Sequence, residues 1–239
     1  MNPVAVFRHS ITEGPGYFAT VLDRHRIPWR LIKTDEGEAV PVDPADFSGL
    51  AFMGGPMSVN DDLPWIPPVL QLIATAVRTE VPVIGHCLGG QLISKALGGV
   101  VTRNPVKEIG WGRVDILPRD ESRSWLGEVA SFESFHWHGE TFSIPPGAVR
   151  LAASAYCPNQ IFALGKHVGM QCHVEMTPAL IKDWCRDWDQ EVRSLTRHTP
   201  SVQTPDQMLR EVEQKTVRLH SIADQIYGVW MRGLLNGKG

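Results

Sequence analysis

The segment at residues 85–91, Gly-His-Cys-Leu-Gly-Gly-Gln, constrains the fold more than any other part of the chain. It follows an apolar run at 81–84 that is typical of a buried strand, and it opens a run at 88–97 with apolar residues at helical spacing. A glycine on either side of the bend removes Cβ atoms that would collide in so tight a turn. The pattern predicts a strand, a sharp turn at Cys87 and a helix.

This turn favours a chemical role for Cys87. The first N–H groups of a helix lack partners inside the helix and carry the positive end of its dipole, which favours a thiolate over a thiol. An arbitrary cysteine is more often a small, buried apolar residue. The glycines at positions 85 and 89, together with the change from strand to helix, favour the hypothesis of a nucleophile.

A base for such a nucleophile is found far along the chain. Residues 168–175 alternate in a way that predicts a strand with His173 and Glu175 on one face. Glu175 would then fix the tautomer of His173 and stabilise the imidazolium that forms when His173 takes the thiol proton. Alone, a His-x-Glu pair is more often structural, but a cysteine at a strand-to-helix turn makes a catalytic pair the better interpretation.

Three motifs together carry a family resemblance: Gly54-Gly55-Pro56, Gly85 to Gln91, and His173-Val174-Glu175. In this order and spacing, the chain resembles the class I glutamine amidotransferases over about residues 1–185, and it is similar to the glutaminase domain of GMP synthase. The resemblance implies that Cys87 attacks a γ-glutamyl carbonyl and forms a thioester. It further implies that His173 acts as base and then acid, oriented by Glu175.

The resemblance also implies binding residues. The backbone N–H groups of Gly55 and Leu88 would form the oxyanion hole, and Gly54 and Gln91 would contact substrate. Gln91 could instead cap its own helix. Residues 135–140 resemble a loop that reads His-Gly-Asp in nucleotide-forming members, so that His138 and Gly139 would help to hold glutamine.

The same two histidines, His136 and His138, have other interpretations. They could be satisfied by hydrogen bonds near the rim of the pocket, or they could bind zinc beside Glu140. No third and fourth ligand stands out at a suitable spacing, so the sequence predicts no metal site.

Two features depart from the family pattern. Most members read Phe-His-Pro-Glu where this chain reads Cys172-His173-Val174-Glu175, and valine keeps the extended backbone that the triad needs. There is also no Gly-rich nucleotide loop ending in Lys-Ser or Lys-Thr. We therefore expect no cofactor, a small γ-glutamyl substrate such as glutamine, and any synthetase to be a separate partner.

Charge and cysteine content indicate the kind of partner and the compartment to expect. A formal net charge of −3 without charge blocks gives no electrostatic case for nucleic acid or a membrane surface. No apolar run approaches the roughly 18 residues that span a bilayer. The cysteines at 87, 157, 172 and 185 show no paired short spacing, and a reactive thiol is endangered in an oxidising compartment, so we expect a cytoplasmic protein.

Alternating strands and helices predict an α/β fold: an open, mainly parallel twisted sheet with helices on both faces, of the flavodoxin-like type. Strands are expected near 3–8, 28–33, 50–53 and 81–86, and helices near 15–26, 64–79 and 88–98. Short antiparallel strands are expected within 100–172, followed by a helix from Thr177 to about Val192.

The organisation predicted from this pattern is a catalytic domain at 1–190 and a C-terminal helical extension at 191–239. The extension carries a stripe of apolar residues at helical spacing from Val212 to Trp230, which must be buried. A helix laid over its own domain is the favoured interpretation, and a short coiled coil between subunits is the alternative.

Three functions are compatible with these residues. The first is a glutaminase that passes ammonia to a partner, and the second is a stand-alone γ-glutamyl hydrolase or peptidase with the same triad. The third is a regulatory binding protein that keeps the fold without turnover; intact Cys87, His173 and Glu175 weigh against it.

Overall fold

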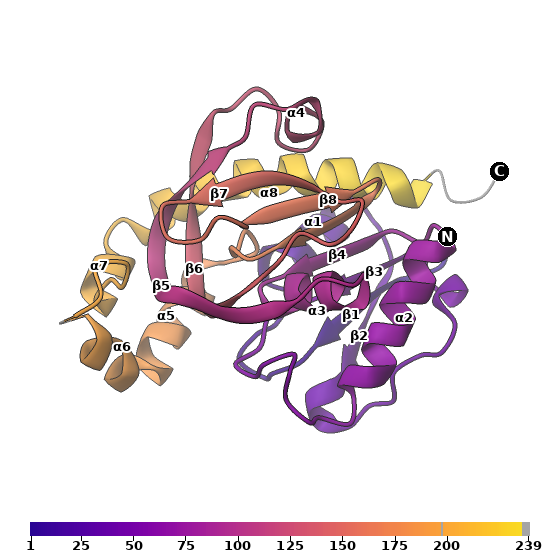
Figure 1. Ribbon diagram of the computed structural model, residues 1–239, viewed down its shortest axis with the longest axis horizontal. Helices are drawn as coiled ribbons and strands as arrows, with labels where there is room; N and C mark the ends of the chain where they lie inside the picture. The colour runs from indigo at the N-terminus through magenta and orange to yellow at the C-terminus, as the bar shows by residue number, and fades with distance from the viewer. Residues whose placement is uncertain (197, 236–239) are drawn as a thin grey trace.

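The computed structural model describes residues 1–196 and 198–235 (Figure 1), and within them the strands form one nine-stranded sheet. The strand order is β2-β1-β3-β4-β9-β8-β7-β5-β6. The first five strands in this order are parallel: β2 (Trp29–Lys33), β1 (Val4–Arg8), β3 (Gly49–Phe52), β4 (Val83–His86) and β9 (His167–Met170). The others extend the sheet with antiparallel pairings: β8 (Ile161–Leu164), β7 (Val149–Ser154), β5 (Val101–Ile116) and β6 (Ser131–Phe142).

Helices cover both faces of the parallel strands, which confirms the predicted fold class. Helices α1 (Gly16–Arg24) and α8 (Val212–Leu235) pack on one face, while α2 (Ile66–Arg78) and α3 (Leu88–Ala96) pack on the other. Strand β1 shows the division, because Val4 and Val6 join the core under α1 and α8 whereas Ala5 and Phe7 join the core under α2 and α3. Both faces of these strands are therefore buried, as parallel sheets require.

Two predictions about strands were wrong. Residues 135–140 were predicted as a loop but lie in β6, paired with β5. The predicted strand at 168–175 ends at Met170, because its neighbour β4 ends at His86 and offers no further partner. Beyond that point only His173 pairs again, in an isolated bridge to Phe135.

The helix predicted from Thr177 to Val192 is two helices, α5 (Pro178–Asp187) and α6 (Asp189–Leu195). They meet at Trp188, whose backbone is not helical. Thr177 caps α5 as expected, since its side chain accepts a hydrogen bond from the N–H of Leu180. The short elements η1 (Thr34–Glu36), η2 (Pro44–Asp46), α4 (Asp120–Leu126) and α7 (Pro205–Leu209) complete the fold and were not predicted.

Helix α8 buries its predicted stripe against the same molecule. It contacts α1, α4, α5 and β6, and the stripe from Val212 to Trp230 is buried.

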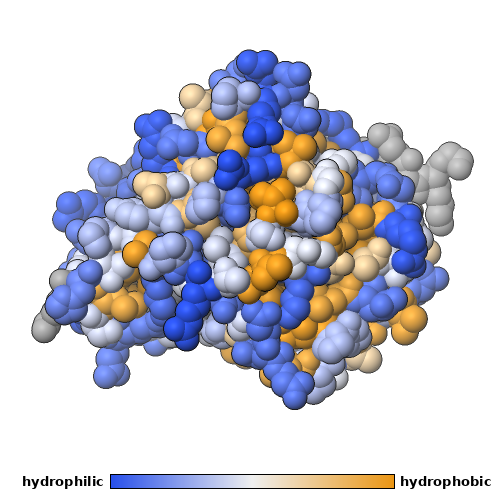
Figure 2. Space-filling view, viewed as in Figure 1, coloured by the Kyte–Doolittle hydropathy of each residue, from blue (hydrophilic) through white to orange (hydrophobic). Residues whose placement is uncertain are grey.

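Polar side chains predominate around the outline of the face shown in Figure 2. Among the described helices, none combines the length and apolar character needed to cross a membrane.

Candidate active site

Cys87 stands at the junction of β4 and α3 with a strained backbone, φ 50° and ψ −108°. Its N–H donates to the carbonyl oxygen of Met170 at 2.8 Å, which anchors the turn to β9. A Cβ on Gly85 would overlap the backbone of Gly89, and one on Gly89 would overlap the carbonyl of Phe52. The two glycines are thus required for the turn that holds the cysteine at the carboxyl end of the sheet.

His173 and Glu175 meet as their spacing predicted. His173 Nδ1 lies 2.6 Å from Glu175 Oε1, and both side chains are buried. Burial lowers the pKa of His173, but the negative charges of Glu175 and Cys87 outweigh it and raise that pKa well above its ordinary value. Burial raises the pKa of Glu175, but the nearby His173 and His86 bring it below its ordinary value. The carboxylate of Glu175 therefore stabilises the imidazolium that His173 forms when it takes up a proton.

Strand β6 contacts both Cys87 and His173. The N–H of His173 donates to the carbonyl oxygen of Phe135 at 2.9 Å, and Cys87 Sγ lies 3.8 Å from the carbonyl oxygen of Trp137. His173 Nε2 is buried and has no hydrogen-bond partner among the described residues. The Trp184 ring packs edge-on against the imidazole, with centroids 5.1 Å apart. This leaves Nε2 available to take a proton from the thiol.

Glu13 belongs to the site and was missed by sequence reasoning. A Cβ on Gly54 would overlap the Glu13 carboxylate and lie 3.2 Å from His173 Cε1, so the glycine lets the two side chains approach each other. Burial raises the pKa of Glu13 to about 7; His173 lowers that pKa and Glu175 raises it. The signal that could have found Glu13 is its place in the loop after β1, because reactive groups of an open α/β sheet gather at the carboxyl ends of strands.

A cleft of about 840 Å³ opens onto Cys87 and Glu13, while His173 and Glu175 lie outside its lining. Its lining includes Cys87, Glu13 and four of the residues predicted to bind substrate or oxyanion: Gly55, Gln91, His138 and Gly139. Gly54 lies behind the lining, against His173. Other parts of the wall include residues 103–107 of β5, residues 56–58 of the loop after β3, and the tryptophans Trp137 and Trp188.

The two predicted oxyanion-hole residues are neighbours. A Cβ on Gly55 would lie 2.7 Å from Leu88 Cδ2. Leu88 is the first residue of α3, so its N–H has no partner inside the helix and points its dipole towards the turn. The loop after β3 and the start of α3 therefore face each other beside Cys87.

Two of the predicted substrate contacts are engaged within the protein. Gln91 Nε2 donates to Gln171 Oε1 at 3.2 Å. His138 Nδ1 lies 2.9 Å from the carbonyl oxygen of Glu140, and His138 Nε2 lies 2.9 Å from Glu108 Oε2. The substrate roles of Gln91 and His138 stay predictions.

The site thus combines a strained cysteine, a buried His-Glu pair and an adjacent helix N-terminus. A family model described as "Glutamine amidotransferase class-I" matches residues 24–184, which is more than half of the chain. The chain belongs to the class I glutamine amidotransferase family.

Known proteins of this family share its architecture. The chain is 32% identical over 195 residues to the glutamine amidotransferase-like protein YfeJ of Salmonella typhimurium, covering 78% of this chain and 81% of that protein. The crystal structure of a glutamine amidotransferase from Methylobacillus flagellatus superposes with a TM-score of 0.95 at 43% identity, covering 98% and 95% of the two chains.

A further relative matches over a shorter stretch. One of the subunits of a GMP synthase from Sulfurisphaera tokodaii, described as glutamine-hydrolysing, is 33% identical over 110 residues, which are 46% of this chain and 56% of that one. The chain thus matches little more than half of the length of that curated relative.

Proposed function

We propose that this protein hydrolyses the side-chain amide of glutamine through a thioester on Cys87. His173 takes the thiol proton, Cys87 attacks the γ-carbonyl, and the oxyanion receives hydrogen bonds from the N–H groups of Gly55 and Leu88. His173 then protonates the leaving ammonia, and water releases glutamate by the reverse sequence. Glu175 holds the imidazole in the productive orientation throughout.

The observation that carries this proposal is the buried 2.6 Å contact between His173 Nδ1 and Glu175 Oε1, with His173 Nε2 unpartnered within the described residues. A histidine whose Nδ1–H is donated to a carboxylate presents Nε2 as the proton acceptor. Cys87 is among the groups that raise the pKa of His173, which supports an interaction between the two.

Glutamine as substrate is supported by the family and by the glutamine-hydrolysing relative. Ammonia would then pass to a separate synthetase partner, since the sequence contains no nucleotide-binding loop of the Gly-rich type. A thiolate nucleophile works best in a reducing compartment, so we expect a cytoplasmic location.

A second candidate is favoured by the cleft. Its volume of about 840 Å³ exceeds what a single amino acid fills, and Trp137 and Trp188 offer apolar wall beside Cys87. A stand-alone γ-glutamyl hydrolase acting on γ-glutamyl peptides or amines would use this space for its leaving group. The two candidates share the acyl-enzyme intermediate and differ in the leaving group, which is ammonia in the first and a larger amine or peptide in the second.

The deciding experiment is a mass-spectrometric screen of the purified protein against glutamine and a panel of γ-glutamyl peptides and amines. Release of ammonia from glutamine alone supports the first candidate, and faster release of larger amines supports the second. Cys87→Ala should abolish turnover and the covalent adduct with a γ-glutamyl electrophile. His173→Ala should lower kcat by several orders of magnitude.

The catalytically silent alternative makes the opposite prediction. If the wild-type protein forms no adduct and releases no product from any compound in the panel, the protein is a binding protein and the triad is not in use.

A further inference from the structure

A second polar cluster lies on β6, on the opposite face of the strand from Phe135 and Trp137. Successive residues of a strand point to opposite faces, so His136 and His138 share the face that looks away from those two aromatics. In the register of the β5–β6 ladder, Glu108 is directly opposite His138, and Gly110 is opposite His136. One ligand atom from each of Glu108, His136 and His138 lies within 4.8 Å of the other two, and all three residues are buried.

Both ring nitrogens of His138 lie against hydrogen-bond acceptors. Its Nδ1 lies against a backbone carbonyl, which can only accept, so Nδ1 carries the hydrogen and Nε2 of the neutral ring is an acceptor. That Nε2 faces the Glu108 carboxylate at 2.9 Å, so two acceptors meet and something positive must lie between them. Either a proton or a metal ion can fill that role.

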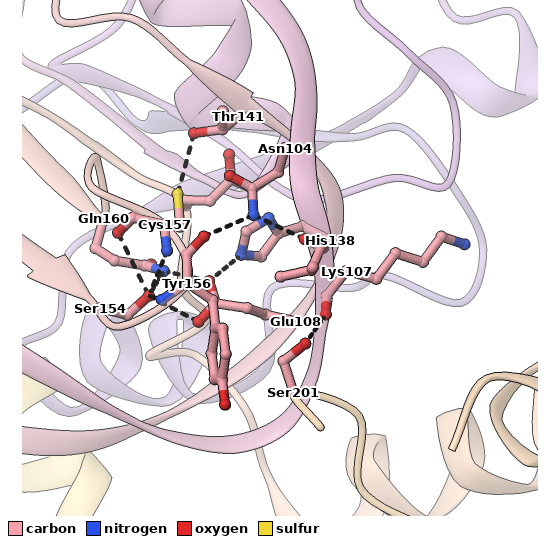
Figure 3. A network of polar contacts seen from close by, with 12 residues as sticks. Asn104, Lys107, Glu108, His138, Thr141, Ser154, Tyr156, Cys157, Gln160 and Ser201 are labelled. Carbon is pink, nitrogen blue, oxygen red and sulfur yellow. Dashed lines mark hydrogen bonds and ion pairs between the residues drawn. The ribbon is translucent and has the colours of Figure 1, made fainter. Parts of the chain in front are cut away.

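The Glu108 carboxylate is held in the way that ligating carboxylates are held (Figure 3). Ser154 Oγ donates to Oε1 at 2.7 Å, and Gln160 Nε2 donates to Oε2 at 2.8 Å. The carbonyl on His138 Nδ1 completes a shell of outer hydrogen bonds that fixes both side chains. Metal-binding histidines and carboxylates are oriented by partners of this kind.

His136 supplies an independent observation. Its side chain is buried, with 1% of the residue exposed, yet neither ring nitrogen has a hydrogen-bond partner among the described residues. A buried polar group without a partner is costly and calls for a missing one. One of its nitrogens is the atom that lies within 4.8 Å of the Glu108 and His138 ligand atoms.

We propose that Glu108, His136 and His138 form a Zn²⁺ site that joins β5 to β6 behind the active-site cleft. Two imidazoles and one carboxylate are a ligand set that zinc accepts, with a fourth position left for water. The ion would enter from the cleft, because His138 forms part of its wall.

The position suggests what the ion does. The pairing of β5 with β6 shifts between Arg103 and Glu108, and residues 103–107 in that irregular stretch line the cleft. An ion held by Glu108 at the end of this stretch would fix one wall of the cleft to β6. The role is structural, and it is independent of the proposed glutaminase reaction.

The test uses the full chain carrying Cys87→Ala, because the catalytic thiol and His173 could themselves bind zinc. After treatment with a chelator, Zn²⁺ is titrated in competition with a chromophoric chelator. We expect one equivalent per chain and a higher Tm with zinc than without. Cobalt substitution should give spectra without thiolate-to-metal charge transfer, because the ligands are nitrogen and oxygen.

Two variants in that background locate the site, Glu108→Gln and His136→Gln. Each should weaken zinc binding by more than about 100-fold, because loss of an outer-shell partner alone costs 10–100-fold. His25→Gln is the matched control, since His25 is exposed at the end of α1, outside the cluster. This variant should bind zinc with unchanged affinity.

Three results would overturn the proposal: less than one equivalent bound by the Cys87→Ala protein, unchanged affinity in folded Glu108→Gln, or a thiolate band with cobalt. Circular dichroism establishes whether the variants are folded. If they are not, anomalous diffraction from zinc-soaked crystals of the Cys87→Ala protein decides the question, and an ion anywhere other than between Glu108, His136 and His138 rejects the site.

Discussion

Glu13 is a buried carboxyl beside His173, and its raised pKa places its change of charge near neutral pH. Burial raises its pKa to about 7, while an unfolded glutamate has a pKa near 4.5. Between these values the unfolded chain is ionised at this position and the folded chain still holds the proton. The contribution to stability is complete below pH 4.5 and is lost as pH rises through 7.

Glu13→Gln should therefore stabilise the protein at pH 8 and not at pH 4.5. The difference in pKa corresponds to about 3 kcal/mol of unfolding free energy. Urea denaturation of both proteins across this pH range measures it. The same difference in unfolding free energy between variant and wild type at pH 4.5 and at pH 8 would contradict a raised pKa at Glu13.

The carboxylate of Glu175 raises the pKa of His173, so its removal has a predictable sign. In Glu175→Gln the imidazolium loses its proton at lower pH, and the basic limb of the kcat/KM profile should move down by at least about one pH unit. kcat should fall as well, because the ring is no longer held. Glu213→Gln, which changes an exposed carboxylate on α8, should leave the profile unchanged. A fixed basic limb in Glu175→Gln would show that His173 does not set it.

At the scale of elements, the turn between β4 and α3 has no room for a side chain at its glycines. A methyl group on Gly89 would overlap the carbonyl of Phe52, which is backbone and cannot rotate away. Gly89→Ala should cost about 1–3 kcal/mol of unfolding free energy, as overpacking does. Gly228→Ala on α8 meets nothing within 4 Å and should be neutral or stabilising. Chemical denaturation compares the two, and equal stabilities would exclude a steric requirement at Gly89.

Elements defined by local pattern were predictable, and those defined by distant partners were not. The four parallel strands β1 to β4, the turn at Cys87 and the cap at Thr177 follow from residues close in sequence. Strand β6 escaped prediction because buried polar residues such as Ser134, His136 and His138 interrupt its apolar pattern. Its pairing strand is β5, where Glu108 faces His138. The strand through His173 was overextended because its end is set by β4.

The same distinction applies to the site. Cys87, His173 and Glu175 could be proposed from motif and spacing, since each motif fixes its own geometry. Glu13 and Glu108 could not, because their significance comes from burial beside groups more than a hundred residues away or on another strand. Sequence proximity carries no information about such contacts.

On the scale of the whole molecule, α8 packs against the sheet that carries Cys87. Tyr227 Oη lies 2.9 Å from Nε2 of His86, the residue before Cys87. The Trp230 ring packs beside Gly49 of β3 and the Phe18 ring of α1. These contacts bear on the predicted boundary between a domain at 1–190 and an extension at 191–239, since an independent catalytic domain would not depend on them.

Trp230→Ala tests that boundary. If α8 and the sheet unfold together, the cavity should cost the whole protein about 3–5 kcal/mol, and near- and far-ultraviolet circular dichroism should report one coincident transition. Val217→Ala removes an exposed side chain from the same helix and should change stability by no more than about 0.5 kcal/mol. Two separate transitions, with only the smaller one shifted by Trp230→Ala, would instead support a catalytic domain that folds without its C-terminal helix.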